Sequence, residues 1–271
     1  MVNIQSIPVA HIHGGETTLG AFDEAIRHSI TKMSHLHFVA AEDYRKRVIQ
    51  LGEDPSNVYL VGGLGVDAIK KVELLPKEEL ESKLGIEFMQ KSLLITFHSV
   101  TLEPETSEKQ MKELLSALSN LQDTTLIFTM PNADSGGLKL IEMIEQFVSV
   151  NDNSYSFISL GHKLYLSCLA QVDGVVGNSS SGLTEVPSFK KATVNIGDRQ
   201  KGRLEASSVI NCEPKELHIS DALKKIFSDD YQVNLRSVTN PYGDGNSSDK
   251  ILNILKSNSL DLTVKKKFYD L

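Results

Sequence analysis

A glycine- and serine-rich segment offers the clearest anion-binding pattern in this sequence. Residues 177–185 lie between an apolar strand pattern and the start of a helical one. Small side chains let a ligand approach the backbone, and unpaired N–H groups at a helix start attract negative charge. We expect Ser179 and Ser180 to meet an anion, with Glu185 one turn further on and able to accept two hydroxyls. The same pattern also fits an ordinary Ser-rich helix cap.

A second segment carries titratable groups. His11 and His13 alternate along a predicted strand and therefore face the same side. A zinc site needs further ligands, and no His-Glu-x-x-His or Cys pair supplies them, so we expect no metal there. Glu16 and Asp23 have the residue types of an acid/base pair, whose task the environment would set. Asp23 equally fits a charge that complements a helix start.

Polar residues also follow three later strand patterns. His98 and Asn132 each come directly after an apolar run, and Arg199 lies in a basic, glycine-containing loop over 197–203. Ligands of open α/β sheets bind outside the carboxyl ends of the strands, so these loops and Ser179 are expected to share one crevice. The alternatives are a structural histidine, an Asx-type turn and a solvated charged turn.

Alternating strand and helix patterns must position these residues. Repeated units of this length predict an α/β fold with parallel sheets and helices on both faces. A charged helical pattern over 66–84 reads as a connector, and the basic cluster at 265–267 reads as a solvated helix end. The predicted strands are 7–12, 36–40, 58–61, 93–97, 125–129, 156–158, 174–176 and 192–196, and the other predicted helices are 21–33, 42–51, 106–121, 137–150 and 162–170.

Composition narrows the class of protein. The 271 residues are 40% hydrophobic and 23% charged, which suits a globular protein with a sizeable core. No apolar run is long enough to span a membrane, and the first residues do not form a signal peptide. A net charge of −7 disfavours nucleic-acid binding. Two cysteines make no disulfide framework, so we expect a cytoplasmic protein.

Together these segments resemble the hydrolysing branch of the UDP-N-acetylglucosamine 2-epimerase family. The match covers nearly the whole chain in order, and its combination of motifs is more specific than any one of them. The resemblance implies a glycosyltransferase-B-like fold with two Rossmann-type parallel-sheet domains. It implies the expected divisions 1–66 (remnant of the N-terminal domain), 67–91 (connector) and 92–271 (UDP-binding domain). The matching segments are 7–16, 177–186, 195–203 and 240–245.

The resemblance also implies roles for individual residues. Ser179 and Ser180 would contact the diphosphate and Glu185 the ribose hydroxyls. Glu16 and Asp23 match acidic catalytic residues of the family. The remaining implied contacts are Tyr165 near uracil, Asn132 and Arg199 lining the nucleotide site, and His98 beside the diphosphate and sugar. The reaction implied is elimination of UDP to a glycal, followed by water addition that inverts C2 and releases N-acetylmannosamine, without metal or cofactor.

One departure from the family pattern is large. The family places a strand, a Gly-rich loop and a further catalytic Asp before the strand that here starts at Ile7. On the order of 100 residues of the N-terminal domain therefore have no counterpart, so we expect little turnover from this chain alone. A non-catalytic UDP-sugar-binding fragment, a related glycosyltransferase and an epimerase of a UDP-2,4-diacetamido-trideoxy sugar are the alternatives. The expected partner is the UDP-sugar, with no nucleic acid or membrane, and the chain is expected to form a homo-oligomer.

Overall fold

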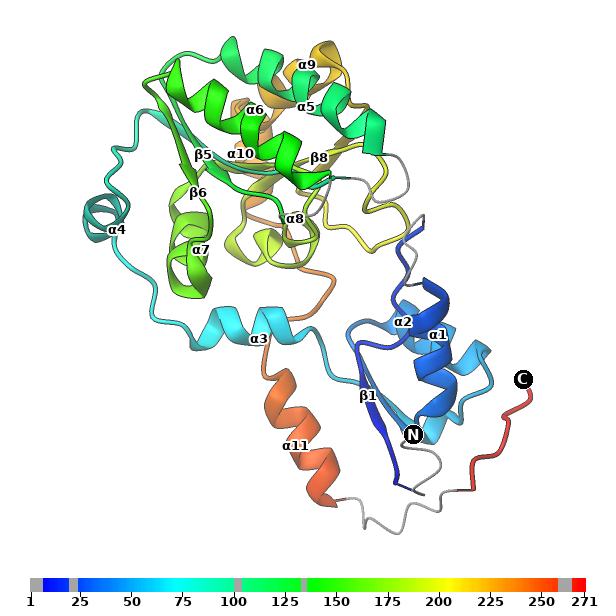
Figure 1. Cartoon of the computed structure of the whole chain (residues 1–271). Coiled ribbons are helices and arrows are strands. Elements are labelled where there is room, and N and C mark those ends of the chain that lie inside the picture. The colour runs from blue at the N-terminus through cyan, green and yellow to red at the C-terminus, as the bar shows by residue number, and fades with distance from the viewer. Residues whose placement is uncertain (1–6, 20–23, 100–103, 133–135, 258–264) are drawn as a thin grey trace. The chain divides into compact units, whose positions relative to one another are not determined.

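The computed structural model describes residues 7–19, 24–99, 104–132, 136–257 and 265–271. The chain forms two compact α/β units (Figure 1). The first unit contains Met1–Lys71 and Asn240–Leu271, and the second contains Val72–Thr239. Parallel strands connected by helices build both units, as the alternating sequence pattern predicts.

The second unit is built on a sheet of six parallel strands in the order β6-β5-β4-β7-β8-β9. Counted from β4, this is the order 3-2-1-4-5-6 of a doubly wound sheet, which reverses direction between β4 and β7. Apolar runs such as Leu-Leu-Ile in β4 suit strands that are buried on both faces. The strands are β4 (Lys91–Thr96), β5 (Thr124–Thr129), β6 (Ser154–Phe157), β7 (Gly174–Gly177), β8 (Ala192–Ile196) and β9 (Val209–Cys212).

Helices cover both faces of this sheet. In Figure 1, α5 (Pro104–Ser119), α6 (Gly137–Ser149) and α9 (Glu216–Ile226) lie on one side. On the other side lie α7 (Gly161–Gln171) and α8 (Ser181–Thr184). The remaining helices of the second unit are α4 (Lys77–Leu84), η3 (Val186–Phe189) and α10 (Asp229–Leu235).

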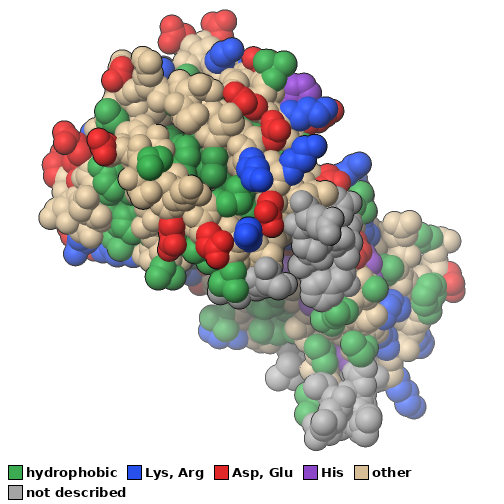
Figure 2. Space-filling model, turned by 45° about the horizontal axis from the view of Figure 1, so that its top comes forward, with side chains coloured by type: hydrophobic (Ala, Val, Ile, Leu, Met, Phe, Trp, Pro, Cys, Tyr) green, Lys and Arg blue, Asp and Glu red, His purple; other side chains and the backbone are tan. Residues whose placement is uncertain are grey.

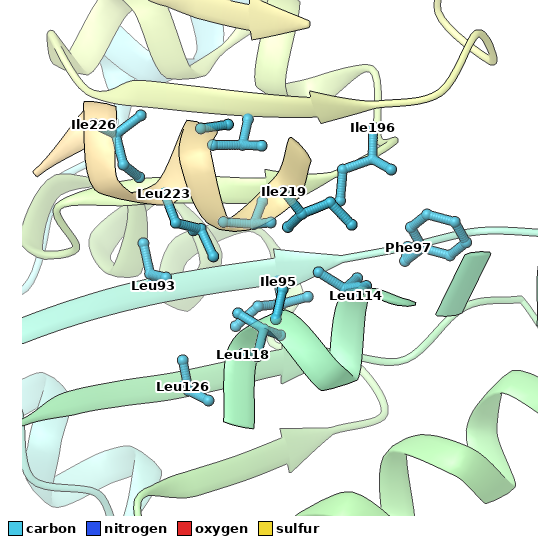
Figure 3. Close-up of a cluster of buried hydrophobic side chains, with 14 of the residues drawn as sticks. Leu93, Ile95, Phe97, Leu114, Leu118, Leu126, Ile196, Ile219, Leu223 and Ile226 are labelled. Atoms are coloured by element: carbon cyan, nitrogen blue, oxygen red, sulfur yellow. The ribbon is translucent and has the colours of Figure 1, made fainter. Parts of the chain in front are cut away.

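The main core of the second unit lies between α5, α9 and the sheet. Figure 3 shows Ile219, Leu223 and Ile226 of α9 on the helix face turned toward the strands. Their spacing of four and three residues places them on one stripe of the helix. They are at most 1% exposed, so this packing fixes the sheet whose carboxyl edge carries the predicted site residues.

The first unit contains three parallel strands in the order β1-β2-β3. Its core includes Phe38 of β2 together with Ile251, which lies in the last helix of the chain's described part, Ser247–Ser257. The elements of this unit are β1 (Ala10–Ile12), α1 (Glu24–Met33), β2 (Leu36–Val39), α2 (Glu42–Gln50), η2 (Pro55–Asn57), β3 (Val58–Leu60), α3 (Leu64–Lys71) and α11 (Ser247–Ser257).

Several predicted boundaries differ from the structure. The strand expected over 7–12 is shorter, and Ala10 and Ile12 on it are exposed rather than buried. The helix expected over 66–84 is two helices, α3 and α4, because Pro76 disfavours helical backbone at the residue before it. The compact units also group differently from the expected divisions, since 240–271 packs with the first unit through Ile251.

Candidate functional site

The strand order of the sheet reverses between the adjacent strands β4 and β7. Hydrogen bonds connect the residues that follow these two strands. Asn178, after β7, is 1% exposed. The backbone N–H of His98, after β4, donates to Asn178 Oδ1 at 2.7 Å, and Asn178 Nδ2 donates to the His98 carbonyl at 2.9 Å. The predicted residue His98, itself half-buried, is therefore held at the reversal point.

Gly177 allows this close approach of the two strand ends. It has φ +139°, and a Cβ built on it would lie 2.0 Å from the Thr96 carbonyl oxygen. Any side chain would therefore push β7 away from β4. Two further hydrogen bonds hold Asn178, the residue after Gly177. Arg199 Nη1 and Gln200 Nε2 donate to the Asn178 carbonyl at 3.0 and 2.8 Å. Arg199 thus lies at the same edge as His98 and Asn178.

The segment after Asn178 makes a much shorter helix than its sequence suggests. α8 contains only Ser181–Thr184, so a full helix dipole is absent from this described segment and any anion contact has to come from loop N–H groups and hydroxyls. Ser179 Oγ accepts the Ser181 N–H at 3.4 Å. Gly182 lies against β8, where the Thr193 hydroxyl donates to its carbonyl at 2.7 Å.

Tyr165 and Glu185 both bond to Ser181 beside this loop, Tyr165 through its hydroxyl and Glu185 through its backbone N–H. The Tyr165 hydroxyl, on α7, donates to Ser181 Oγ at 2.6 Å. Burial raises the pKa of Tyr165 and the charge of Glu185 raises it further, although the bond to Ser181 lowers it. The phenol therefore stays neutral. Ser181, to which the sequence assigned no role, connects the two predicted residues.

The other predicted position in this unit is Asn132, which is exposed in the loop after β5. Two pockets lie elsewhere in the unit. One of about 500 Å³ opens at the carboxyl ends of β8 and β9 and includes Gly197, and one of about 950 Å³ runs along α5 and α9. Neither is lined by the predicted binding residues. On the face shown in Figure 2, acidic and basic side chains of this unit are interspersed.

Glu16 of the first unit lies in a partly enclosed polar cluster. It is 6% exposed, its Oε1 lies 2.7 Å from His13 Nδ1, and its Oε2 lies 3.7 Å from Arg27. The Leu64 N–H donates to His13 Nε2 at 3.4 Å, which leaves Nδ1 as the ring nitrogen that faces Glu16. Burial, helped by nearby positive charge, lowers the pKa of His11 to about 4, so His11 is neutral at pH 7.

Asp23, the expected partner of Glu16, lies outside the described residues. Its neighbour Glu24 was not singled out from the sequence. Glu24 Oε2 accepts the Thr18 N–H at 3.0 Å, and its Oε1 lies 3.1 Å from His28 Nε2. Glu24 therefore ties the loop that follows Glu16 to the start of α1.

The described residues contain neither a metal-binding cluster nor a membrane-spanning helix. Among them, no three His, Cys, Asp or Glu side chains group as a metal site. Both ring nitrogens of His13 already have hydrogen-bond partners. No helix in the described part of the chain is long and apolar enough to cross a membrane.

Comparison with known proteins identifies the family. The model of the UDP-N-acetylglucosamine 2-epimerase family matches residues 2–256. The chain belongs to the UDP-N-acetylglucosamine 2-epimerase family. A Campylobacter jejuni relative, the GDP/UDP-N,N'-diacetylbacillosamine 2-epimerase (hydrolyzing), is 42% identical over 99% of this chain and 70% of its own length. The Escherichia coli polysialic acid biosynthesis protein P7 is 41% identical over 94% of this chain and 65% of its own length.

Solved structures confirm the fold class of this 2-epimerase family member. The co-structure of S. aureus MnaA with UDP superposes with a TM-score of 0.78 at 19% identity, covering 99% of this chain and 72% of that one. A putative UDP-N-acetylglucosamine 2-epimerase from Listeria monocytogenes gives a TM-score of 0.76 at 17% identity, over 100% of this chain and 72% of that one. The expected glycosyltransferase-B-like fold with Rossmann-type parallel sheets is therefore confirmed. The chain spans between 65% and 70% of the length of the first curated relatives it matches.

Proposed function

We propose that this family member is a hydrolysing 2-epimerase that converts UDP-N-acetylglucosamine and water into UDP and N-acetylmannosamine. The observation that carries the proposal is the hydrogen-bonded group of His98, Asn178 and Arg199. It lies where the strand order of the second unit's sheet reverses. Doubly wound sheets bind nucleotides at this point. Membership of the epimerase family supports 2-epimerisation as the chemistry performed on the bound nucleotide sugar.

In this proposal the second unit holds the UDP group. Ser179 and Ser180 donate to the diphosphate from a loop whose backbone is open to a ligand, because small residues surround it. Glu185 accepts the ribose hydroxyls, and the neutral Tyr165 ring packs near uracil. Arg199 supplies positive charge, and Asn132 lines the exposed rim.

The first unit supplies groups for proton transfer. A base removes the proton from C2 of the sugar while the C1–O bond breaks and UDP leaves, which gives a glycal. Water then adds across the double bond, with a proton delivered to the opposite face of C2, and the free sugar is released. Glu16 and Asp23 carry these transfers, and His98 assists beside the diphosphate. The burial of Glu16 and its contact with His13 suit a carboxyl group that exchanges protons.

A second candidate substrate is a UDP-2,4-diacetamido-trideoxy sugar. Two relatives favour it, because the Campylobacter jejuni protein and a 33%-identical Legionella pneumophila protein are both named as N,N'-diacetylbacillosamine 2-epimerases (hydrolyzing). The third candidate is UDP-sugar binding without turnover. It follows from the share of the relatives' length that this chain spans.

Incubation with each UDP-sugar in heavy water separates the candidates. Proton transfer from solvent to a glycal leaves deuterium at C2 of the released sugar, which NMR detects. Calorimetric titration with UDP, with GDP as the comparison, tests the nucleotide site independently of turnover. UDP binding without sugar release supports the binding-only candidate, and absence of UDP binding would overturn the proposal.

A further inference from the structure

The C-terminal residues 265–271 run along the first unit, and one lysine on them meets the end of α1. Lys266 Nζ lies 2.6 Å from the Ser34 carbonyl oxygen, 2.8 Å from that of Lys32 and 3.3 Å from that of Thr31. The last carbonyl groups of a helix have no partner within the helix, and a positive charge beside them is favourable. Lys266 therefore caps α1 from a distant part of the chain.

The same ammonium group reaches a buried carboxylate. Glu53 is 2% exposed, and its side chain lies 2.6 Å from Lys266 Nζ, 2.6 Å from Lys32 Nζ and 2.9 Å from His37 Nε2. Burial alone would raise the pKa of Glu53, but hydrogen bonds from His37, Lys266 and Lys32 outweigh it and lower the pKa to about 2. Lys266 thus joins α1 to the segment that follows α2 through a charged network.

Two aromatic residues near the end of residues 265–271 also contact the first unit. The Tyr269 N–H donates to the Gly52 carbonyl at 3.0 Å, and the Phe268 ring centroid lies 4.8 Å from Lys32 Nζ. Gly52 has φ +85°, and a Cβ on it would lie 2.3 Å from the Phe268 ring. Residues 265–271 therefore contact this unit at Gly52 and Lys32, although Phe268 stays 65% exposed.

Helix α1 lies between this attachment and Glu16, the candidate catalytic carboxylate. Thr31 is the one buried residue of this helix, so apolar packing holds α1 weakly. Its polar contacts lead to the predicted catalytic cluster. Arg27 lies 3.7 Å from Glu16, Glu24 accepts the Thr18 N–H, and the Thr31 hydroxyl lies 3.3 Å from His11 Nδ1.

We propose that residues 265–271 form a strap that holds α1, and that Lys266 is a positioning residue for Glu16. The inference rests on the proposed catalytic role of Glu16 for its functional meaning. Lys266 touches no substrate in this proposal. It acts at the last turn of α1, and α1 transmits the restraint to the loop that carries Glu16.

Hydrogen exchange of the full chain tests the strap. Lys266→Met removes the charge and keeps the length of the side chain, and Lys266→Arg restores the charge. Lys267→Met is the matched control, because Lys267 is the exposed lysine next to Lys266 in the same segment. We expect amides of α1 and of residues 13–18 to exchange roughly 10-fold faster in Lys266→Met, the scale of losing a charged hydrogen bond. Lys266→Arg should recover most of the protection, and Lys267→Met should match the original chain.

A spectroscopic signal separates positioning from general stability. Isotope-labelled His13 reports its contact with Glu16, so its ring nitrogen signals should shift in Lys266→Met and return in Lys266→Arg. A chain ending at Lys267 keeps Lys266 but loses Phe268 and Tyr269, and it should show a smaller effect. Equal acceleration across β2, β3 and α1, or unchanged His13 signals, would overturn the proposal. None of these readouts involves UDP or turnover, so failure here is distinct from failure of the proposed function.

Discussion

The Asn178 side chain binds both backbone polar groups of His98, with its oxygen accepting the N–H at 2.7 Å and its nitrogen donating to the carbonyl at 2.9 Å. An amide is the neutral side-chain group that offers a donor and an acceptor side by side in this way. Asn178 therefore connects the two strand ends at the reversal point and fixes the backbone that carries His98.

Replacement of Asn178 by Ala should destabilise the second unit by about 1–3 kcal/mol, because buried polar groups lose their partners. UDP affinity should fall as well, since the loop beside Ser179 loses its anchor. Urea unfolding and calorimetry measure the two effects. Asn234→Ala, which removes an exposed amide on α10, is the control and should change stability by no more than about 0.5 kcal/mol. Equal effects of both substitutions would contradict the anchoring role.

Gly177→Ala should be more damaging than a substitution at an equally unusual but open glycine. Its Cβ would meet the Thr96 carbonyl at 2.0 Å, whereas Gly161, with φ +64°, has no such neighbour within 4 Å. We expect Gly161→Ala to cost about 1 kcal/mol from backbone strain alone. Gly177→Ala should cost clearly more and weaken UDP binding. Thermal unfolding of both variants, side by side, checks the order.

Glu185→Ala should weaken UDP binding by about 1–3 kcal/mol, the scale of losing hydrogen bonds to a charged group. The fold should be retained, because Glu185 is only half-buried. Glu142→Ala, at an exposed carboxylate of α6, serves as the matched control in calorimetric titration. Unchanged UDP affinity in Glu185→Ala would refute contact with the ribose.

Glu16→Gln and Asp23→Asn should each lower turnover by roughly 10²–10⁴-fold in a form of the protein that carries the activity. UDP affinity should stay nearly intact, because the amides keep the shape and neither residue belongs to the UDP-binding unit. Release of the N-acetylated sugar is the assay. Full activity in both variants would leave Asp23 as a helix-end charge and Glu16 as a structural residue.

The stability of the first unit should depend on pH through Glu53. The folded-state pKa of about 2 lies below the usual 4.5, so the ionised form is stabilised by folding. This contribution is fully present above about pH 4.5 and is lost as the pH falls toward 2. Glu53→Gln should therefore reduce protection at neutral pH and flatten the dependence between pH 4.5 and 2. Exchange of β2 amides across this range measures it, with the exposed Glu79→Gln as the control.

Much of the fold follows from local patterns in the sequence. The range 192–196 is β8 as predicted, and the strands around 36–40 and 125–129 differ from the structure only at their ends. Buried parallel strands are continuous apolar runs bounded by glycine or polar residues, so they are visible locally. β9, α9, α10 and α11 were not predicted, because the sequence after residue 203 was interpreted mainly through short motifs.

The site is less accessible to such reasoning. Strand-end logic places His98 and Arg199 at one edge, but it gives no reason to choose Asn178 or Ser181, whose partners are set by tertiary contacts. The cluster at 265–267 shows the same limit. We expected a solvated helix end, whereas Lys266 lies in irregular structure and pairs with Glu53, a partner too far along the chain for any local pattern to reveal.

The first unit is assembled from two segments that the second unit separates in the chain. During synthesis, residues 72–239 form a continuous stretch that can fold as soon as it leaves the ribosome. Residues 1–71 must wait for Ile251 to complete their core and for Lys266 to cap α1. Residues 1–71 are thus made before the second unit but completed after it, and a nascent chain arrested before residue 240 would expose Leu36 and Phe38 to chaperones.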